Sequence, residues 1–328
     1  MPTAFISGIG GQDGAYLAHF LLAKKYRVVG GARSLSDSIE YSNLEALKIR
    51  QRVELRPFDL TDAASMRRAL ESSAPDEIYN LAAQSSVAAS WKNPLETAEV
   101  TALGALRLFQ SAREFCPRAR IFQASSSEMF GCANGIVDET TPFCPTNPYG
   151  AAKTHAHHVA VALRESGAAI SCGVLFNHES PLRSADFVSR KVSLAVARIQ
   201  AGLQDELSLG NLDVVRDWGF AGDFVRAMWQ MLQIEPADFL IATGKPRSLR
   251  DFVDQAFRVV GLDWQSFVRV DETLFRPSET PPIVADTTQS STRLGWKPEL
   301  SFKQLVRLMV EADIVRVAEK PDIAYFAN

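Results

Sequence analysis

Short β-branched segments alternate with longer helical patterns through the first half of the chain, and this alternation limits the folds that the chain can adopt. The segments that favour strands are residues 3–7, 27–30, 53–56, 77–81, 119–124 and 170–175. Helical patterns fall between them, at about 13–23, 63–72, 95–114 and 148–166. A helix between two strands carries the chain back across one face of the sheet, so that the strands lie parallel. The pattern predicts an α/β fold with a doubly wound parallel sheet.

The pattern changes after Asn177, where the apolar segments become shorter and are separated by helical stretches. Examples are residues 206–209 and 239–242, and proline-containing loops follow at 276–278 and 281–282. We therefore expect two parts, the parallel sheet in residues 1–177 and a smaller α/β lobe in residues 178–328. A crossing of the chain back to the first part stays open at this stage. A ligand usually occupies the cleft between two such lobes.

A glycine-rich segment, GIGGQDG at residues 8–14, follows the first strand and opens the first helix. Gly8, Gly11 and Gly14 fit a phosphate loop, in which glycines permit a tight turn, close approach of pyrophosphate and close packing of helix on sheet. The pyrophosphate of a dinucleotide would meet the N–H groups at the start of that helix. A glycine-rich turn without a ligand is the alternative, but the flanking strand and helix favour dinucleotide binding.

The end of the second strand indicates which dinucleotide is bound, because NAD sites usually place an acidic residue there to bond the ribose 2′-hydroxyl. This strand ends with Arg33 and Ser34, and the first carboxylate after it is Asp37. A guanidinium can pair with a 2′-phosphate, so NADP is favoured. The alternative is that Arg33 is an ordinary surface residue. After the third strand, Asp59 and Leu60 could contact adenine, although Asp59 could equally cap the following helix.

Tyr149 and Lys153 lie four residues apart in an expected helix, so their side chains share one face. A lysine cation beside the phenol stabilises the phenolate and lowers the pKa of Tyr149 from about 10 toward neutrality. Tyr149 could then act as a general base toward a substrate hydroxyl. The spacing also occurs by chance on solvated helix faces, but its place behind a glycine loop and a series of βα units favours a catalytic pair.

The fifth strand runs into a cluster of polar residues, Ser125, Ser126, Ser127 and Glu128. In an open parallel sheet the chemistry gathers at the carboxyl ends of the strands. Serine clusters commonly satisfy nearby backbone groups, and that is the alternative for the three hydroxyls. A carboxylate that faces a cleft can remove a proton from a C–H acid, as an elimination requires. Glu128 is therefore a candidate base.

Composition and charge exclude several other classes of protein. With 328 residues, 46% of them hydrophobic and 22% charged, the chain has the composition of a globular protein. The formal net charge of -3 gives no electrostatic basis for binding nucleic acid or an anionic membrane. No apolar run approaches the roughly 20 residues that span a bilayer, and the first strand begins too early for a signal peptide. We therefore expect a cytoplasmic protein.

The cysteines show no spacing typical of metal ligands, whereas the spacing of three histidines suggests a metal at first sight. The four cysteines are Cys116, Cys132, Cys144 and Cys172. They form no CxxC pair, and we expect reduced structural thiols. Three histidines follow Lys153 closely, at His155, His157 and His158. No carboxylate or cysteine partner for them is evident, so exposed helix histidines are the favoured interpretation and no metal is expected.

The glycine loop together with Tyr149 and Lys153 resembles the extended short-chain dehydrogenase/reductases. Further segments resemble one family among them, the GDP-mannose 4,6-dehydratases, over nearly the whole chain. They are GQDGAYL at 11–17, YNLAAQS at 79–85, LFNHESPLR at 175–183, RDWG at 216–219, FRPSE at 275–279 and LGWKP at 294–298. The GQDG and NHESP segments are the most specific. The resemblance implies a Rossmann-like doubly wound parallel sheet that binds NADP in residues 1–177, and a smaller C-terminal α/β lobe that mainly binds a GDP-sugar.

The resemblance also implies a hydro-lyase reaction without net redox, from GDP-mannose to GDP-4-keto-6-deoxy-mannose on tightly held NADP. Tyr149, assisted by Lys153, would deprotonate the C4 hydroxyl while NADP+ takes the hydride from C4. The 4-ketone acidifies the C5 proton, which Glu128 would remove. Water then leaves C6, protonated by Glu128 or a group it relays through, and the hydride returns to C6. Ser126 stands where the family more often has threonine, and its hydroxyl would bond the C4 oxygen.

Binding residues follow from the same resemblance. Cofactor contacts would come from Gly8, Gly11, Gln12, Asp13, Gly14, Arg33, Ser34, Asp59, Leu60, Leu81, Ala83, Ser85, Tyr149, Lys153, His178 and Arg183. Substrate contacts would come from Ser85, Asn177, Lys191, Arg216, Arg276 and Glu279. The arginines would meet the diphosphate, and Glu279 the ribose of GDP. Surface salt bridges are the alternative for Arg216 and Arg276, and a solvated helix face for Lys191.

One segment departs from the family. After Arg33 the family commonly has a second arginine in a serine-rich loop that reaches the cofactor site of a neighbouring subunit, whereas residues 34–40 here read SLSDSIE. The loss of basic charge puts a tetramer formed through that loop in doubt. We therefore expect a homo-oligomer that is a dimer or a tetramer.

Three alternatives to this function stay open. A 4-keto reductase of the same superfamily would consume NADPH on a GDP-4-keto-6-deoxy sugar, and a dehydratase could act on a GDP-manno-heptose. A non-catalytic NADP sensor or scaffold would be expected to lack the active-site groups, yet Ser126, Glu128, Tyr149 and Lys153 are all present. The NHESPLR and GQDGAYL segments favour the dehydratase over the reductase. The sequence does not distinguish hexose from heptose.

Overall fold

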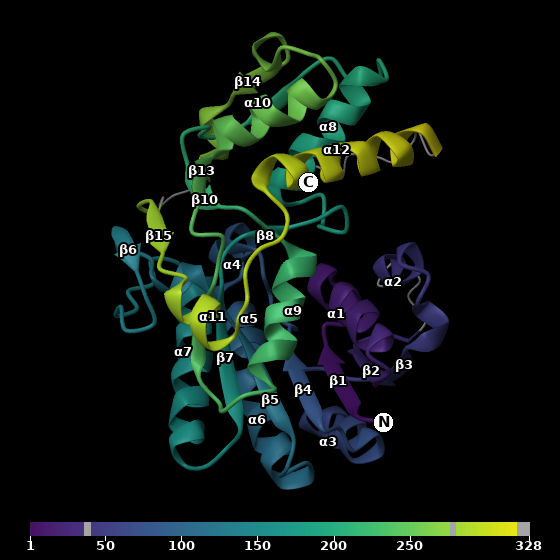
Figure 1. Ribbon diagram of the computed structural model, residues 1–328, viewed down its shortest axis with the longest axis vertical. Helices are drawn as coiled ribbons and strands as arrows, with labels where there is room; N and C mark the ends of the chain where they lie inside the picture. The colour runs from purple at the N-terminus through teal and green to yellow at the C-terminus, as the bar shows by residue number, and fades with distance from the viewer. Residues whose placement is uncertain (36–40, 276–279, 320–328) are drawn as a thin grey trace.

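The computed structural model describes residues 1–35, 41–275 and 280–319. Its centre is a seven-stranded sheet in the order β12-β7-β5-β4-β1-β2-β3 (Figure 1). These strands are β1 (Thr3–Ser7), β2 (Arg27–Ala32), β3 (Glu54–Pro57), β4 (Glu77–Asn80), β5 (Arg120–Ser126), β7 (Ile170–Leu175) and β12 (Asp238–Ile241). All neighbouring pairs are parallel. The strand order reverses between β1 and β4, which leaves a crevice above that point, and the doubly wound fold is confirmed.

Helices cover both faces of the sheet. On one face lie α1 (Gln12–Ala23), α2 (Ser42–Ala46) and α9 (Ala221–Met231), and on the other lie α3 (Ala63–Ser73), α6 (Gly104–Phe115) and α7 (Pro148–Glu165). Successive residues of β1 serve opposite faces, since Ala4 and Ile6 pack in the core around α1 and Phe5 in the core around α3 and α6. A strand covered on both sides needs apolar residues at nearly every position, as the continuous burial of β1 illustrates.

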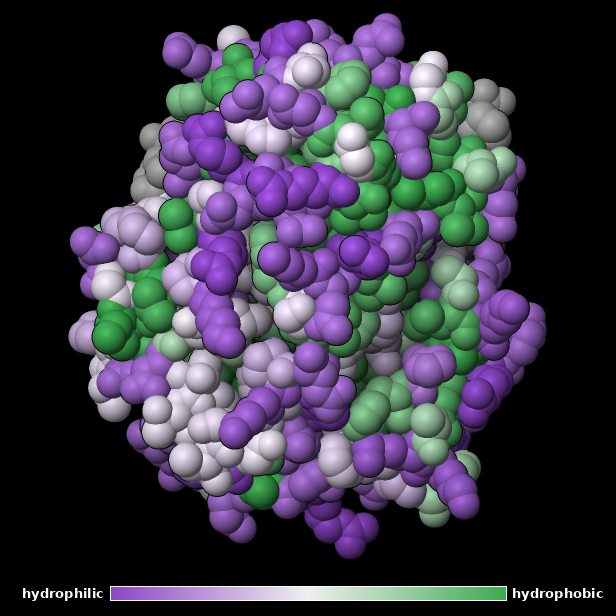
Figure 2. Space-filling view, turned by 45° about the horizontal axis from the view of Figure 1, so that its top comes forward, coloured by the Kyte–Doolittle hydropathy of each residue, from purple (hydrophilic) through white to green (hydrophobic). Residues whose placement is uncertain are grey.

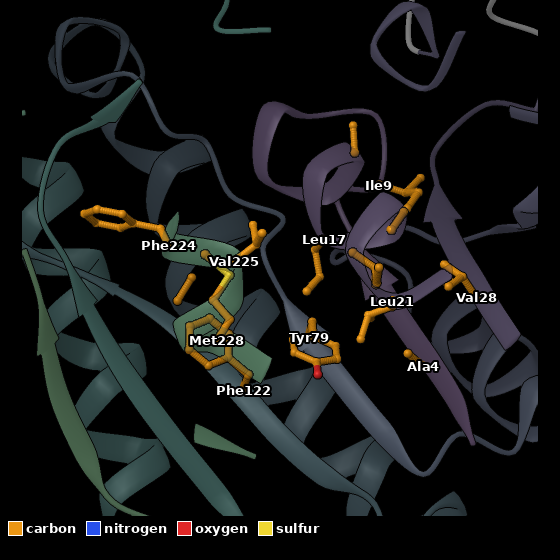
Figure 3. Packing of buried hydrophobic residues seen from close by; sticks show 14 of the residues in the cluster. Ala4, Ile9, Leu17, Leu21, Val28, Tyr79, Phe122, Phe224, Val225 and Met228 are labelled. Carbon is orange, nitrogen blue, oxygen red and sulfur yellow. The ribbon is translucent and has the colours of Figure 1, made fainter. Parts of the chain in front are cut away.

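Close packing of α1 and α9 against the sheet forms the first core. Figure 3 shows Leu17 and Leu21 of α1 and Met228 of α9 above the rings of Tyr79 and Phe122. These side chains are fully buried. Burying each large apolar side chain contributes about 1.5–3 kcal/mol. The packing fixes the start of α1, and with it the glycine loop, above β1.

A smaller lobe stands beyond the carboxyl ends of the strands (Figure 1). It contains α8 (Val188–Gln200), α10 (Leu249–Val259), α12 (Phe302–Glu319) and the parallel pair β9 (Leu207–Leu209) with β14 (Val268–Val270). Val192, Phe252 and Met309 from the three helices are buried in its core. Three further two-stranded pairs are β8 (His178–Glu179) with β11 (Gly219–Phe220), β10 (Val215–Asp217) with β13 (Pro246–Ser248), and β6 (Gly135–Val137) with β15 (Ile283–Ala285).

The chain crosses between the two parts several times. After α8 and β9 it returns to the sheet with α9 and β12, goes out again for α10 and β14, and comes back for β15 and α11 (Thr288–Arg293) before α12. The crossing that the sequence left open is therefore present. β12 forms an edge of the large sheet beside β7, and the N–H of Leu240 donates to the carboxylate of Glu139 at 2.9 Å. That bond occupies a donor that an edge strand would otherwise expose.

The expected helix at 95–114 is divided. It consists of α5 (Pro94–Thr97), the π-helical η2 (Ala98–Leu103) and α6. The remaining elements are α4 (Val87–Lys92) and the 3-10 turns η1 (Arg50–Arg52), η3 (Ser127–Met129), η4 (Trp264–Ser266) and η5 (Glu272–Leu274). No helix among the described residues is long and apolar enough to cross a membrane. Figure 2 shows mostly hydrophilic side chains over one face, with smaller hydrophobic areas between them.

The expectation that all four cysteines are reduced is wrong for one pair. Cys132 and Cys144 form a disulfide with their Cα atoms 5.6 Å apart, whereas Cys116 and Cys172 are free and buried. The chain turns back on itself after η3, and the N–H of Cys132 donates to the carbonyl of Cys144 at 3.0 Å. This turn brings together two cysteines that are 12 residues apart and carry no recognisable spacing.

Candidate active site

Two cavities share Ala83 at the carboxyl ends of the central strands. The first, of about 490 Å³, is lined by Gly8, by Arg33 after β2, and by Asp59 and Leu60 after β3. The second, of about 320 Å³, extends under the smaller lobe. Its lining includes the expected site residues Asp13, Leu81, Ser85, Ser126, Glu128, Tyr149, Lys153, Asn177, His178, Arg183 and Arg216. The fold thus brings residues from both halves of the chain to one place.

The glycine loop has the tight geometry that its sequence predicts. Gly8 has a φ of 70°, and the N–H of Gly11 donates to its carbonyl at 3.0 Å. A Cβ on Gly14 would lie 2.3 Å from the carbonyl oxygen of Gly8, so no other residue fits there. α1 begins at Gln12 with its N–H groups directed at the loop. A cradle of this kind fits the pyrophosphate of a dinucleotide.

Gln12 connects this loop to the segment that follows β7. Its side-chain amide donates to the carbonyl of His178 at 3.0 Å and accepts from the hydroxyl of Ser180 at 2.7 Å. The hydroxyl of Ser180 in turn accepts from the N–H of Leu182 at 3.0 Å. The side chain of Gln12 is therefore committed within the protein, and only its backbone faces the cradle. The GQDG and NHESP segments, distant in sequence, form one hydrogen-bonded unit.

Asp13 and His178 form a buried ion pair in the same unit, with Oδ2 of Asp13 2.8 Å from Nε2 of His178. Burial by itself would raise the pKa of Asp13, but the charge and hydrogen bond of His178 lower it below its ordinary value. Burial acts against the charged form of His178 as well, and the attraction of Asp13 outweighs it, so the pKa of His178 is raised. Nearby, Arg183 stacks on Phe187 with its Cζ 3.6 Å from the ring centroid.

Arg33 lies at the mouth of the first cavity and is exposed. It also lines a third cavity, of about 770 Å³, on the other side of the glycine loop, together with Arg183, Arg190 and Arg316. A space walled by arginines beside a phosphate loop suits an additional phosphate. Asp59 accepts hydrogen bonds from the N–H and the hydroxyl of Thr61, both at 2.8 Å. Ser34 follows Arg33 and is half-buried.

The four expected catalytic residues meet in the second cavity. Ser126 ends β5, Glu128 lies in η3, and Tyr149 and Lys153 lie on the first two turns of α7. The hydroxyls of Tyr149 and Ser126 are hydrogen-bonded, and Nζ of Lys153 donates to the carbonyl of Ala124 at 2.7 Å. Nζ of Lys153 also lies 5.7 Å from the centre of the Tyr149 ring. The arrangement places a phenol, a serine hydroxyl and a carboxylate around one space.

The expected fall in the pKa of Tyr149 is wrong for the protein alone. Burial raises the pKa of Tyr149 to about 12, and the hydrogen bond from Ser126 only partly opposes that effect. Burial also lowers the pKa of Lys153 to about 8, although Asp13 favours its charged form. The lysine cation is itself desolvated, which is why its presence four residues away does not decide the titration of the phenol.

Asn147 is a site residue that sequence reasoning missed. It precedes Pro148 at the start of α7, and its Oδ1 accepts from the N–H of Gly150 at 2.8 Å as the helix N-cap. Its Nδ2 donates to Oε2 of Glu128 at 2.8 Å. An asparagine followed by proline is a recognisable helix start, so the cap could have been found from the sequence. The contact with Glu128 could not, because it depends on the turn after β5.

The substrate residues expected in the smaller lobe are only partly brought together. Asn177 and Arg216 line the second cavity, as does Ser85 after β4. Lys191 is half-buried on α8, where its Nζ donates to the carbonyl of Ser208 at 2.9 Å. Burial lowers the pKa of Lys191. The other two predicted residues, Arg276 and Glu279, lie outside the described residues.

The expectation that His157 is exposed is wrong. It lies on the face of α7 that carries Tyr149 and Lys153, packs against the sheet, and contacts Ser125 through Nδ1 at 2.9 Å. Burial lowers the pKa of His157 to about 4. Within the described ranges, one group of side chains could in principle hold a metal ion. It consists of His157, Cys172 and Asp238, whose potential ligand atoms all lie within 4.8 Å of one another.

A metal has little room to bind that group, because Arg164 already holds both carboxylate oxygens of Asp238. The two hydrogen bonds measure 2.7 and 2.8 Å. The carboxylate charge is therefore balanced, and the histidine beside it is held in its neutral form. That no metal is bound stays a prediction.

A doubly wound sheet with a glycine cradle, a serine at the end of β5, and a tyrosine and a lysine on the adjoining α7 defines an extended short-chain dehydrogenase/reductase fold. A UDP-glucose 4-epimerase from Thermotoga maritima has this fold, with a TM-score of 0.84, 22% identity, and coverage of 97% of this chain and 100% of that one. A dTDP-glucose 4,6-dehydratase from Streptomyces venezuelae gives a TM-score of 0.84 at 23% identity, covering 97% and 99%.

Sequence comparison is more specific. The family model described as GDP-mannose 4,6 dehydratase matches residues 5–309. GDP-mannose 4,6 dehydratase 2 of Arabidopsis thaliana is 45% identical over 322 residues, covering 95% of this chain and 86% of the relative. The GDP-mannose 4,6 dehydratase of Homo sapiens is 42% identical over 348 residues, covering 98% and 93%. The chain belongs to the GDP-mannose 4,6-dehydratase family.

Proposed function

We propose that the protein is a hydro-lyase that converts GDP-mannose to GDP-4-keto-6-deoxy-mannose, with NADP held throughout and no net redox change. The observation that carries this proposal is the meeting of Glu128 with Ser126, Tyr149 and Lys153 in the second cavity. A reductase needs only a proton donor beside the hydride acceptor, whereas an elimination needs a base for a carbon acid as well. Glu128, next to the tyrosine–serine pair, supplies such a base.

The cofactor would lie across the first and second cavities with its pyrophosphate in the glycine cradle. Bound NADP supplies a hydride acceptor at C4 of the sugar and later a hydride donor at C6. The chain's own groups for this cofactor are the N–H groups around Gly11 and Gly14, the Asp13–His178 pair and Arg183. Lys153 would bond the nicotinamide ribose, as expected for a cation on the cavity wall.

Tyr149 and Ser126 would act first, on the C4 hydroxyl of the sugar. The hydrogen bond between their hydroxyls holds the phenol toward the end of β5, so a sugar oxygen placed between them meets both. Tyr149 takes the proton of that oxygen as C4 is oxidised to a ketone. Because burial raises the pKa of Tyr149, the positive charges of Lys153 and of the oxidised nicotinamide must favour the phenolate.

Glu128 would act second, on the carbon acid that the ketone creates. The carboxylate removes the C5 proton, the hydroxyl at C6 leaves as water with a proton from Glu128, and an unsaturated ketone results. Hydride addition at C6 and protonation at C5 then complete the 4-keto-6-deoxy sugar. The departing water carries away the proton that Glu128 took from C5, so Glu128 would be reprotonated from solvent before it protonates C5. The proton that Tyr149 takes from the C4 hydroxyl balances this one, and the cycle neither gains nor loses a proton.

Arg33 would select NADP by pairing with its 2′-phosphate, assisted by Ser34. The exposed guanidinium borders both the adenosine side of the first cavity and the arginine-lined third cavity. From Arg27 to Leu35, where the described residues of this segment end, the chain carries no acidic residue that would instead bond a ribose hydroxyl. In this arrangement Asp59 supports the adenine side through the loop that it caps.

Replacing Arg33 by alanine is expected to weaken NADP binding by about 1–3 kcal/mol and to leave NAD binding nearly unchanged, since one charge-assisted hydrogen-bonding group is lost. Titration of the purified protein with each dinucleotide measures the difference. Arg113→Ala, at an exposed position on α6, is the matched control and should change neither affinity. Equal affinity of the unaltered protein for the two dinucleotides would contradict the assignment.

The GDP part of the substrate would occupy the smaller lobe. We propose that the boundary between the two binding parts lies at residue 177: residues 1–177 would bind mainly NADP, and residues 178–328 mainly the GDP-sugar. Asn177 and Arg216 on the cavity wall would contact the sugar and diphosphate, and Arg276 and Glu279 would complete the site. The amine of Lys191 donates to the carbonyl of Ser208. Lys191 would therefore contact the GDP-sugar only from the side of α8 that faces Ser208.

We also propose a cytoplasmic homo-oligomer, either a dimer or a tetramer. Trp91, Leu95 and Leu103 are exposed on the successive segments α4, α5 and η2. Apolar residues gathered in this way commonly mark a protein interface. The buried free thiols of Cys116 and Cys172 agree with a reducing compartment, whereas the exposed disulfide is uncommon there.

Incubation of the purified protein with GDP-mannose and no added reductant is the direct test of the function. The product is expected to have lost one molecule of water, as measured by mass spectrometry. Consumption of NADPH on a 4-keto sugar, with no reaction of GDP-mannose, would identify a reductase instead. Reaction only with GDP-manno-heptose would move the proposal to that substrate.

A further inference from the structure

The hydrogen bonds of Asn147 determine which of its side-chain atoms faces Glu128. Its Oδ1 accepts from the backbone N–H of Gly150, a group that can only donate. The other atom must therefore be the amide nitrogen, and it donates to Oε2 of Glu128 at 2.8 Å. The helix cap thus fixes the orientation of the amide, without the ambiguity that asparagine side chains usually have.

The same bond restricts where Glu128 can carry a proton. An amide N–H bonds an ionised carboxylate oxygen more strongly than a protonated one, so this contact favours Oε2 as the unprotonated oxygen. Over the described ranges, 1–35, 41–275 and 280–319, no hydrogen bond reaches Oε1. Oε1 is therefore the oxygen available to a carbon-bound proton in the cavity that Glu128 lines.

The chain around this contact leaves it little freedom. Asn147 is buried, the N–H of Cys144 donates to the carbonyl of Met129 at 2.9 Å, and the Cys132–Cys144 disulfide joins the two segments. On the other side, a Cβ on Gly150 would lie 2.5 Å from the carbonyl oxygen of Glu128. Two backbone segments that carry the base and the N-cap are thus held in direct contact.

We propose that Asn147 is a positioning residue for the reaction: it holds Oε2 of Glu128 as an unprotonated acceptor and directs Oε1 at the C5 proton of the sugar. This inference rests on the proposed role of Glu128 as the base. The proton from C5 goes to Oε1 and from there to the departing C6 hydroxyl, while the bond from Asn147 to Oε2 persists. Asn147 touches neither sugar nor cofactor and acts through Glu128.

Asn147→Asp tests the proposal with almost no change in shape. One carboxylate oxygen still caps α7, because aspartate is a good N-cap, but the other presents a negative charge to Oε2. Turnover at neutral pH should fall about 10- to 100-fold with KM changed less than about twofold, as for the loss of a charge-assisted bond. Reduced nicotinamide should accumulate on the enzyme, since C4 oxidation proceeds and C5 deprotonation does not.

The pH profile separates this effect from damage to the fold. The acid limb of turnover should move to higher pH in Asn147→Asp, because ionising Glu128 beside a second carboxylate is harder. The other charged or titratable groups that line the cavities with Glu128 are unchanged in the variant: Asp13, Tyr149, Lys153, His178, Glu179, Arg183, Asp186, Arg216 and Asp217. Asn147→Ser keeps the cap but loses the amide donor to Oε2 without adding a charge, so it should lose turnover and move the limb less than Asn147→Asp does.

Asn93→Asp is the matched control, since Asn93 also precedes a proline at the start of a helix but is exposed and does not line the cavities with Glu128. It should alter neither turnover nor the pH profile. An unshifted acid limb in a folded Asn147→Asp, or equal loss of C4 oxidation and C5 exchange, would overturn the inference. Glu128→Gln tells the two proposals apart. If it turns over normally, the role of Glu128 fails, whereas if it stalls while Asn147→Asp does not, only the role of Asn147 fails.

Discussion

Replacing Tyr149 by phenylalanine is expected to reduce turnover at least about 100-fold, the loss typical of removing a general base. The change removes one hydroxyl from the cavity wall and its hydrogen bond with Ser126. The loss of one such bond changes the free energy of unfolding by only about 0.5–1.5 kcal/mol, so the protein should stay folded. Steady-state turnover with GDP-mannose, together with a dinucleotide titration, measures both properties.

Tyr26→Phe is the control for this substitution. The hydroxyl of Tyr26 bonds Glu77 and Trp229 at the opposite end of the strands from the cavities, so it is removed without touching the site. Turnover should be unaffected there. Near-normal turnover of Tyr149→Phe, with NADP bound as before, would show that another group takes the proton of the C4 hydroxyl.

Replacing Glu128 by glutamine is expected to stop the reaction at the 4-keto stage with reduced nicotinamide on the enzyme. The amide is isosteric with the carboxylate, and its oxygen can still accept from Asn147, but it cannot take the C5 proton. The absorbance of the bound nicotinamide measures the stalled state. In Glu139→Gln, where the side chain can still accept from Leu240, the reaction should run to completion.

Isotopic labels test the same cycle in the unaltered protein. Deuterium at C4 of the substrate should appear at C6 of the product, with little crossover when unlabelled substrate is mixed in, since the hydride never leaves the site. In heavy water, C5 should acquire solvent deuterium, because a proton held by Glu128 can exchange. Label in free NADPH and none at C6 would rule this mechanism out, whereas a reductase would consume NADPH stoichiometrically.

Local sequence patterns predicted six of the seven strands of the sheet, whereas the segment at 239–242, expected in the smaller lobe, forms the edge strand β12. The strands expected at 3–7 and 170–175 coincide with β1 and β7, because both are mainly apolar and buried along their whole length. The division of the helix expected at 95–114 was not predictable in this way. Its π-helical segment preserves the helical pattern in the sequence, and only the positions of neighbouring elements show where the helix changes its pitch.

Parts of the candidate site could be predicted where the residues involved have a fixed spacing within one structural element. The glycine loop and the Tyr149–Lys153 pair have fixed spacings within single elements, and both lie on the cavities. The burial of His157 also follows from spacing, since it lies four residues beyond Lys153 on the same helix face. The titration of Tyr149 was mispredicted because burial outweighs a neighbouring charge, and burial depends on the folded chain.

Contacts between distant segments were not predictable from one sequence. The bond from Asn147 to Glu128 spans 19 residues, and that between Asp13 and His178 spans 165. Each depends on how a turn or a crossing places one segment against another. Such contacts determine which oxygen of Glu128 is left to face the cavity, and which ring nitrogen of His178 is already bonded within the protein.

The position of β12 has a consequence for how the chain folds as it is made. The sheet is incomplete until residue 241 has left the ribosome, because β12 is the strand that covers β7. Until then β7 is an open edge, and the carboxylate of Glu139 has no Leu240 N–H to accept. The edge of β7 in the nascent sheet therefore has no neighbouring strand while about 66 further residues are synthesised, at roughly 5–20 residues per second. For that interval of several seconds the edge of β7 is open to pairing with other strands.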